Sequence, residues 1–464
     1  MTNRASLSAE FGDARDAVKV LRSWRHGGFS KALVALDEVR STNPLASKSP
    51  FIRELTLRLS GEPGPRLLVD GLWLCRAKGG ITRVWEQIFS FWQLPGMFSS
   101  AAPVLLIDRG SHILKSSELH CHKGTVIDPL DLNAVKGLEN ENVAIAKQWG
   151  ADVFLSSWIS TCGSRENVCH ELALVHDCMP ERSLPDEMLL QLRRRWLLGA
   201  SAHMAVSQAT AQDLEGLFCK PAGTIPWCHS APGVSLDDSC SEAAASEMWS
   251  RLFQRMGLKT PFVLLPATSC LGSYKNPELV ADALDHPSMK AVQMVICGIA
   301  ADQHRSELED RFPSLIGRIN AAGFTDQELS LVYRHALAVV IPSRIEGFGL
   351  PVIEALASGG NVLVADSRGL REAGGEAAMR FHPDHPVRLR SLLELFLHDQ
   401  SREAFESVLN RRRQQRLQRL NPDFLGLSLL VLARQLSRLV RAFFLIFFPI
   451  APRRLDLVVI QKGC

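Results

Sequence analysis

The chain contains two sets of short apolar runs that are separated by segments of helical length. Each run is bounded by turn-forming residues, a pattern that is typical of the buried strands of a parallel sheet with crossover helices. The first set comprises residues 67–74, 104–108, 153–157, 172–176 and 204–207, and the second comprises residues 262–265, 292–297, 338–341 and 362–365. We therefore predict an α/β protein with two doubly wound parallel-sheet domains in tandem.

Length and composition agree with this prediction. A chain of 464 residues exceeds the usual size of one domain, and 46% apolar with 22% charged residues excludes disorder, collagen and coiled coil. The 11 cysteines lack the paired spacings of a zinc ribbon or a secreted disulfide framework. Residues 1–10 are polar and lack the apolar segment of a signal peptide. We expect a cytoplasmic protein.

The same patterns suggest four segments. Residues 1–65 form a helical extension, in which residues 28–33 and 43–44 resemble one tetratricopeptide-like hairpin. Residues 66–245 form the first α/β domain and end in a Ser/Ala/Asp-rich stretch at 235–246. Residues 255–400 form the second domain, and residues 401–464 form a basic helical tail. Ligands of paired domains of this kind bind in the crevice at the carboxyl ends of the strands.

The tail carries most of the positive charge. Residues 411–464 include eleven Lys or Arg and two Asp, although the net charge of the whole chain is only +3. Arg434, Arg438 and Arg441 share one helical face, which suits either a helix on an anionic membrane surface or a helix packed on its own protein. The apolar run 442–451 is too short to span a membrane. Nucleic acid binding is not expected, because the arginines are interleaved with Leu and Phe.

The most specific motif follows the run 338–341 and reads PSRIEGFGLPVIEALASG over residues 342–359. Gly347 and Gly349 permit close backbone approach to a ligand, and Pro351 suits the first position of a helix. The free N–H groups at that helix N-terminus favour a phosphate. Glu346 and Glu354 flank this anion site, where ionised carboxylates can accept hydrogen bonds from hydroxyl groups.

This motif resembles the signature of retaining glycosyltransferases of the two-domain GT-B architecture, most like glycosyltransferase family 4 and its mannosyltransferase-like members. The resemblance covers roughly residues 66–400. It implies that Glu346 contacts the donor sugar and that Glu354 contacts the nucleoside ribose. The backbone amides of the intervening residues would hold the sugar, and these residues are Phe348, Gly349 and Leu350.

Two further stretches of the second domain extend the resemblance. Residues 263–268 followed by 275–277 resemble the family's turn and lysine at the donor diphosphate, which implies phosphate contacts for Thr268 and Lys275. Ala267 stands where the family usually has Gly and Tyr274 where it has Arg, so one phosphate contact is expected to be missing. Phe324 lies in a stretch that borders the base, where it either stacks on the base or belongs to the core.

The first domain supplies the acceptor side of the resemblance. Gly79 and Gly80 resemble a glycine-rich acceptor loop, although a plain turn would also explain them. His176 and Asp177 begin an HD-x-x-PE stretch. A neutral His176 oriented by Asp177 could bind a sugar hydroxyl or the donor phosphate, or it could be a structural histidine. Ser207 begins a VSxxT stretch and is the expected N-cap of a helix near the cleft.

The resemblance implies transfer of a hexose, with mannose as one candidate, from a nucleoside diphosphate sugar to a polysaccharide or lipid-linked acceptor. The catalytic residues would be Glu346, His176 and Lys275. No metal or other cofactor is expected, because residues 120–122 alternate faces and lack further ligands. The expected location is the cytoplasm, with the tail at the inner membrane face. Two alternatives remain, a non-catalytic GT-B-like binding module and a sugar-nucleotide epimerase of the same fold.

Overall fold

The computed structural model describes residues 14–76, 79–97, 104–111, 119–163, 168–183, 186–234, 241–259, 261–267 and 269–447. Within these residues the chain forms two six-stranded parallel sheets. The strands of the first sheet are β1 (Leu67–Asp70), β2 (Val104–Asp108), β3 (His120–Lys123), β4 (Val153–Ser156), β5 (His170–Val175) and β6 (Ala202–Ala205). Their order is β3-β2-β1-β4-β5-β6, so the strand order reverses its direction between β1 and β4.

The second sheet repeats this plan in the order β12-β11-β10-β7-β8-β9. Its strands are β7 (Phe262–Leu265), β8 (Gln293–Ile296), β9 (Ile319–Ala321), β10 (Ala338–Ile341), β11 (Val362–Ala365) and β12 (Met379–Phe381). The central strands β7, β8, β10 and β11 are buried along their whole length. The two predicted parallel sheets are therefore confirmed.

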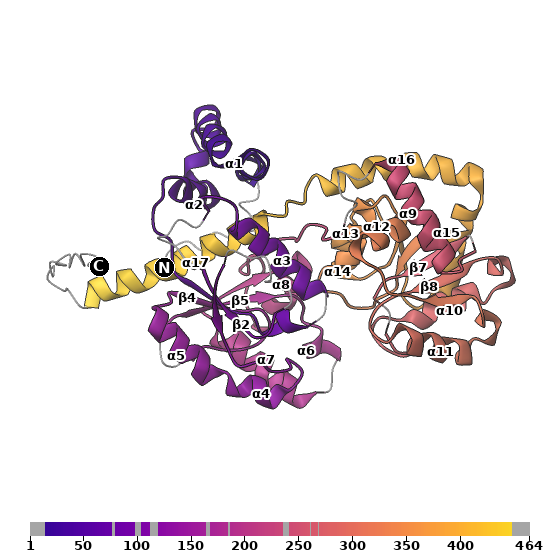
Figure 1. Cartoon of the computed structure of the whole chain (residues 1–464), viewed down its shortest axis with the longest axis horizontal. Helices are drawn as coiled ribbons and strands as arrows, with labels where there is room; N and C mark the ends of the chain where they lie inside the picture. The colour runs from indigo at the N-terminus through magenta and orange to yellow at the C-terminus, as the bar shows by residue number, and fades with distance from the viewer. Residues whose placement is uncertain are drawn as a thin grey trace, which may run out of the picture.

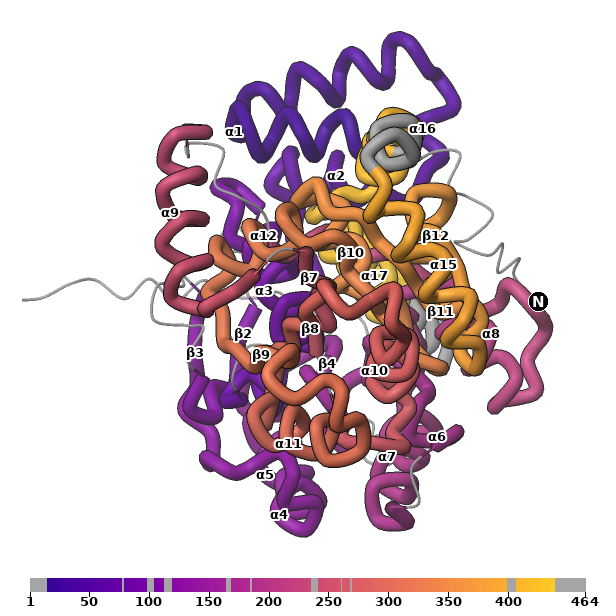
Figure 2. The backbone as a smooth tube through the Cα atoms, turned by 90° about the vertical axis from the view of Figure 1, so that its right-hand side faces the viewer, coloured from indigo at the N-terminus to yellow at the C-terminus, as the bar shows by residue number. Residues whose placement is uncertain are grey.

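Helices cover both faces of each sheet (Figure 1). Those of the first domain are α3 (Gly80–Trp92), α4 (Leu132–Gly137), α5 (Glu139–Trp149), α6 (Pro180–Ser183), α7 (Glu187–Gly199) and α8 (Gln208–Leu217). Those of the second are α9 (Glu242–Arg255), α10 (Pro277–Leu284), α11 (Ala301–Arg311), α12 (Asp326–His335), α13 (Leu350–Ala357), α14 (Arg368–Gly374), α15 (Pro386–Leu397) and α16 (Asp399–Leu417). Figure 2 shows α12 on one side of the second sheet and α10 on the other.

The helical extension consists of α1 (Ala14–Thr42) and α2 (Pro50–Leu59). Helix α1 is interrupted at Gly28, whose φ of 73° and ψ of −173° are not helical. The two halves fold back on each other, because Lys19 Nζ lies 2.7 Å from Glu38 Oε2 although a continuous helix would hold these residues far apart. The chain thus reverses its direction at Gly28, and the two halves of α1 form a helical hairpin.

The C-terminal segment is divided between the two domains. Helix α16 lies on the second domain, whereas α17 (Phe424–Phe447) returns to the first domain beside α2 and α3 (Figure 1). Leu427, Leu429 and Leu430 of α17 are fully buried, and Asp423 just before it pairs with Arg25 of α1. Residues 424–436 therefore pack on their own chain. Among the described residues, no helix has the length and apolar content needed to cross a membrane.

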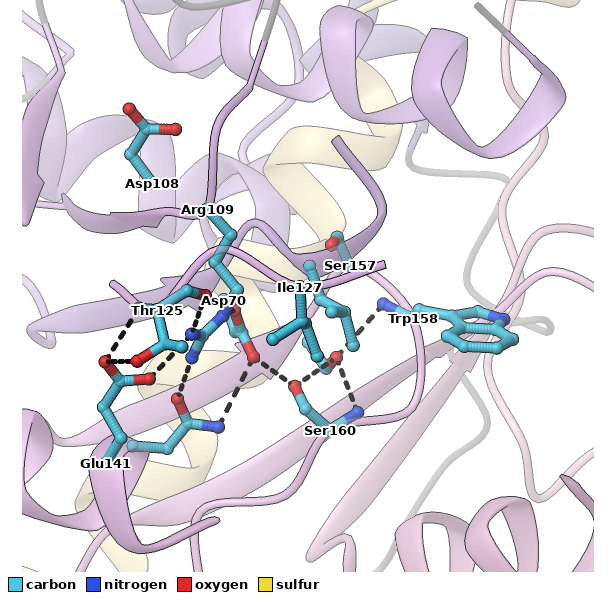
Figure 3. A network of polar contacts seen from close by, with 12 residues as sticks. Asp70, Asp108, Arg109, Thr125, Ile127, Glu141, Ser157, Trp158 and Ser160 are labelled. Atoms are coloured by element: carbon cyan, nitrogen blue, oxygen red, sulfur yellow. Dashed lines mark hydrogen bonds and ion pairs between the residues drawn. The ribbon is translucent and has the colours of Figure 1, made fainter. Parts of the chain in front are cut away.

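A buried polar network holds the carboxyl ends of β1, β2 and β4 together (Figure 3). Arg109 Nε donates to Asp70 Oδ1 at 2.5 Å, and the side chains of both residues are fully buried. Arg109 also donates to Glu141 at 2.7 Å and to Asn142 at 2.8 Å, while the Ser160 hydroxyl donates to Asp70. Because each charge has a partner, the network can fix the loops where the strand order reverses.

Candidate functional site in the interdomain cleft

A cleft of about 520 Å³ lies between the two domains at the carboxyl ends of their strands. It brings together most of the residues that the sequence singles out. The lining includes Gly79, Gly80, His176, Asp177, Lys275, Phe324, Glu346, Phe348, Gly349, Leu350 and Glu354. Ser207 lies beside the cleft without being part of its lining, and Thr268 lies outside the described residues.

The loop between β10 and α13 forms one wall of this cleft. Gly349 is the N-cap of α13 and has a φ of 111°, a conformation that favours glycine. The helix begins at Leu350, so Pro351 occupies its second position rather than the expected first. At Gly347 an added Cβ would lie 1.9 Å from the backbone oxygen of His176 in the other domain. The absence of a side chain at Gly347 therefore allows the two domains to approach each other here.

Glu346 and Lys275 face each other in the cleft. Lys275 Nζ lies 2.6 Å from Glu346 Oε1, and both side chains are about four-fifths buried, with exposed fractions of 22% and 18%. Burial alone disfavours the charged ammonium, but the Glu346 carboxylate and Tyr274 raise the pKa of Lys275 above its usual range. Lys275 is therefore a fixed positive charge, and its partner Glu346 can accept a hydrogen bond from a hydroxyl group in the cleft.

Glu354 is the second carboxylate of the motif and its side chain is fully buried. Arg83 of α3, in the other domain, places Nη1 2.7 and 2.8 Å from the two carboxylate oxygens. Arg83 Nη2 also donates to Asp326 at 3.0 Å, and the Tyr333 hydroxyl lies 3.4 Å from Glu354 Oε2. Burial raises the pKa of Glu354 although Arg83 opposes this shift. A ligand hydroxyl that binds Glu354 must therefore share the carboxylate with Arg83.

His176 and Asp177 lie on the first-domain side of the cleft. Burial, reinforced by the charge of Arg193, lowers the pKa of His176 to about 3, so the imidazole is neutral at physiological pH. Within the described residues its Nε2 atom is buried without a hydrogen-bond partner. The Asp177 carboxylate accepts from the Met179 N–H at 3.0 Å, and no direct bond joins it to the imidazole in this part of the chain. Asp177 thus fixes the loop after His176 and not the ring itself.

Further contacts across the cleft hold the domains together. Ser207 caps α8 as predicted, because its side chain accepts a hydrogen bond from the Thr210 N–H. The hydroxyl groups of Ser207 and Thr210 both donate to the Gly347 carbonyl oxygen. Glu372 of α14 accepts from the first two N–H groups of α8, at 2.6 and 2.8 Å, and contacts His229 Nε2 at 2.5 Å. The ring of Phe348 stacks on His229, with a centroid distance of 4.6 Å. The loop between β10 and α13 is therefore anchored to the first domain.

Ala267 departs from the pattern that the sequence resembles, and the sequence leaves two environments open for Phe324. Ala267, where the family usually has Gly, has a φ of 56° in the left-handed region. The turn thus keeps a glycine-like conformation without the glycine. Phe324 is partly buried against the core and also lines the cleft.

The sequence reasoning assigned no role to Arg83, Asp326 or Tyr333. Arg83 stands three residues after Gly80. If Glu354 is buried, its carboxylate needs a cationic or hydrogen-bonding partner, and this need is the signal for a further site residue. The sequence does not show that this partner is Arg83, because Arg83 is far from Glu354 in sequence.

Metal-ligating clusters were also sought in the cleft and elsewhere. Across the described ranges, no group of three or more His, Cys, Asp and Glu side chains is arranged to hold a metal ion. Residues 120–122 lie in the exposed strand β3.

Comparison with known proteins places these features in context. Residues 253–414 match the family model of glycosyl transferases group 1. A D-inositol 3-phosphate glycosyltransferase of Corynebacterium aurimucosum is 26% identical over 37% of this chain and 43% of its own length. The serotype-specific mannosyltransferase WbdA of Escherichia coli is 26% identical over 53% of this chain and 30% of its own length. The matches thus span less than half the length of these relatives.

Solved structures show the fold over a longer part of the chain. HepE of Anabaena in complex with UDP-glucose is 17% identical, with a TM-score of 0.59 over 82% of this chain and 100% of its own. The lipopolysaccharide glycosyltransferase WaaG is 14% identical, with a TM-score of 0.57 over 78% of this chain and 98% of its own. The chain therefore has the GT-B fold, and its residues 253–414 form a glycosyl transferases group 1 domain.

Proposed function

We propose that this protein is a retaining glycosyltransferase that transfers a hexose from a nucleoside diphosphate sugar to a glycan or lipid-linked acceptor. The observation that carries the proposal is the convergence of Glu346, Lys275 and the N-terminus of α13 in one interdomain cleft. The group 1 domain at residues 253–414 and the mannosyltransferase among the relatives support this class of reaction.

The donor diphosphate is assigned to Lys275 and to the positive end of the α13 helix dipole. Among the described residues that line the cleft, the cations are Arg83 and Lys275. Arg83 is engaged by two carboxylates and Lys275 by one, so Lys275 is assigned as the main point charge for the phosphates. The proposal assigns no role to a metal ion.

Glu346 is assigned to the hydroxyl groups of the donor sugar, and Glu354 to those of the ribose. In the reaction, the bond between the anomeric carbon and the phosphate oxygen breaks, and its electron pair leaves with the diphosphate. The acceptor oxygen bonds to the same face of the anomeric carbon, and its proton passes to the departing phosphate. The charge that develops on the diphosphate is stabilised by Lys275. Neither Glu is a covalent nucleophile in this scheme.

His176 is assigned to the region between donor and acceptor. A neutral imidazole with a free Nε2 atom can donate to, or accept from, a sugar hydroxyl without adding charge to the cleft. The acceptor would enter past Gly79 and Gly80 at the start of α3. We expect the acceptor to be a polysaccharide or a lipid-linked oligosaccharide, and the protein to act in the cytoplasm.

Mass spectrometry of products from a panel of nucleoside diphosphate sugars tests the proposal. We expect acceptor-dependent transfer with one donor, and a loss of about 10²–10³ in turnover for Glu346→Ala. Asp310→Ala, which removes an exposed carboxylate from the same domain, is the matched control. Unchanged turnover in Glu346→Ala would contradict the assignment of the donor-sugar site to Glu346. Epimerised donor formed without acceptor would favour the epimerase, and no nucleotide binding at all would favour the non-catalytic module.

A further inference from the structure

A second concave site lies far from the interdomain cleft, where the helical extension meets α17. It is a groove of about 450 Å³ whose walls come from α1, α2, the short turn between them, and α17. Four arginines line this groove, and they are Arg40, Arg53, Arg434 and Arg438. Four guanidinium groups thus lie around one cavity.

The carboxylate that lines the groove is already neutralised. Glu54 is buried, with an exposed fraction of 1%, and it accepts from Arg58 Nε at 2.8 Å and from Arg434 Nη2 at 3.1 Å. Burial lowers the pKa of Arg58, and the positive charge of Arg434 contributes to this shift against the effect of Glu54. Arg58 and Arg434 therefore share the single negative charge of Glu54. Glu54 does not neutralise the other arginines that line the groove.

Among the described residues, Arg40, Arg53 and Arg438 are the three groove arginines whose side chains do not pair with Glu54. Arg40 Nη2 donates to the Thr56 hydroxyl at 2.7 Å, and Arg53 Nε donates to the Ser47 carbonyl oxygen at 3.0 Å. Arg438 is exposed. Within the described part of the chain, none of the three forms an ion pair. Like charges around one cavity repel each other, and an anion in the groove would remove this repulsion.

The guanidinium groups that line the groove favour a phosphate among anions. A planar guanidinium can give two parallel hydrogen bonds to a phosphate, and several of them can surround its oxygen atoms. Pro50 and Arg53 from the first turn of α2 line the groove as well, so the positive end of that helix dipole adds to the field. We propose that this groove binds the phosphate group of a phosphomonoester or phosphodiester, carried by a soluble molecule or by a lipid headgroup.

This site changes the role that the sequence suggested for the basic tail. The apolar side of α17 is not free to enter a bilayer over residues 424–436, because Leu425, Leu427, Leu429 and Leu430 are buried against the protein. A lipid would therefore be held through its phosphate by the arginines and not by insertion of the helix. The inference is independent of the transfer reaction, since the groove shares no residue with the interdomain cleft.

Binding measurements on the full chain test the proposal with two probes. The first is inorganic phosphate, titrated by calorimetry, and the second is phosphatidylcholine vesicles with and without phosphatidylglycerol, assayed by flotation. The test variant is Arg40→Gln/Arg53→Gln/Arg438→Gln. The control variant is Arg22→Gln/Arg194→Gln/Arg251→Gln, which removes the same charge from exposed positions outside the groove.

We expect the protein to bind at least one probe, and the groove variant to lose at least about ten-fold in affinity while the control variant retains it. Binding of phosphate would indicate a soluble ligand, and binding of anionic vesicles without measurable phosphate binding would indicate a headgroup at a surface. Equal losses in the two variants, or no binding of either probe by the unmodified protein, would overturn the proposal. Arg438→Gln alone, which removes an exposed side chain, repeats the test if the triple variant does not fold.

Discussion

Arg83 of the first domain and Glu354 of the second form an ion pair across the cleft, with Nη1 at 2.7 and 2.8 Å from the two carboxylate oxygens. The pair joins α3 of the first domain to α13 of the second. It therefore couples the proposed ribose site to the relative position of the two domains. A nucleoside hydroxyl at Glu354 has to form its hydrogen bonds in the presence of this arginine.

The first prediction concerns this pair. Arg83→Met should destabilise the protein by about 3–5 kcal/mol, because among the described residues the Tyr333 hydroxyl is then the one remaining partner of the buried Glu354 carboxylate. The double variant Arg83→Met/Glu354→Gln should recover much of this loss, since the uncompensated charge is then absent. Thermal unfolding followed by circular dichroism measures both, with Arg22→Met as a surface control. A double variant no more stable than Arg83→Met would contradict the explanation.

The second prediction concerns the domain contact at Gly347. A Cβ at this position would lie 1.9 Å from the His176 backbone oxygen, so Gly347→Ala must push the donor-side loop away from the first domain. The hydroxyls of Ser207 and Thr210 would then lose their acceptor, the Gly347 carbonyl. We expect faster hydrogen–deuterium exchange in the first turn of α8 and a loss of about 100-fold in kcat/KM.

Gly216→Ala is the matched control for this substitution. Gly216 lies in α8, and an added Cβ there meets no atom within 4 Å outside the helix's own backbone, so turnover should be unchanged. Because alanine favours a helix more than glycine does, exchange in the first turn of α8 should not become faster. Equal exchange in Gly347→Ala and the unmodified protein would show that the loop does not depend on this close approach.

Much of the fold could be predicted because the buried strands carry their own signal. The central strands of both sheets are apolar on both faces, and parallel sheets covered by helices require this. The strands that were missed, β3, β9 and β12, lie at or next to sheet edges. Strand β3 reads HCHK and is exposed along its length, so hydropathy could not identify it. Strands β9 and β12 contain only three residues each.

The sequence predicted the site residues that belong to one loop, but it did not predict the contacts that form where the two domains meet. Glu346, Gly349 and Glu354 belong to one local motif, and all three line the cleft as expected. The pairing of Glu354 with Arg83 joins residues 271 positions apart and depends on how the domains sit together. The same holds for the tail, because the sequence of α17 fits a membrane surface as well as it fits packing against α2 and α3 of its own chain.

A third prediction concerns backbone strain at Ala267. This residue has a φ of 56°, and a Cβ in the left-handed region costs roughly 1–2 kcal/mol relative to glycine. Ala267→Gly should stabilise the protein by up to about 1 kcal/mol, after the larger unfolded-state entropy of glycine is subtracted. Urea denaturation measures the change. Ala336→Gly is the control with the opposite expected sign, since Ala336 has an ordinary φ of −64°. Loss of stability in Ala267→Gly would show that the turn is unstrained.

The last prediction uses the pH dependence of stability. The pKa of His176 is lowered by burial to about 3 in the folded protein, whereas an unfolded histidine titrates near pH 6.5. Between these values the unfolded chain binds the proton and the folded chain does not. The stability that depends on the neutral ring is therefore fully present above about pH 6.5 and is lost as the pH falls toward 3.

His176→Gln removes this titration, so the free energy of unfolding should fall less steeply on acidification than in the unmodified protein. The difference in slope should approach about 1.4 kcal/mol per pH unit below pH 6. Asp177, whose pKa is raised by burial, contributes with the opposite sign, but it is present in both proteins and cancels in the comparison. Urea denaturation at pH 7.5, 6.0 and 5.0 measures the two slopes. Parallel curves would mean that the folded protein protonates this ring readily, and a neutral His176 could then no longer be assigned to the space between donor and acceptor.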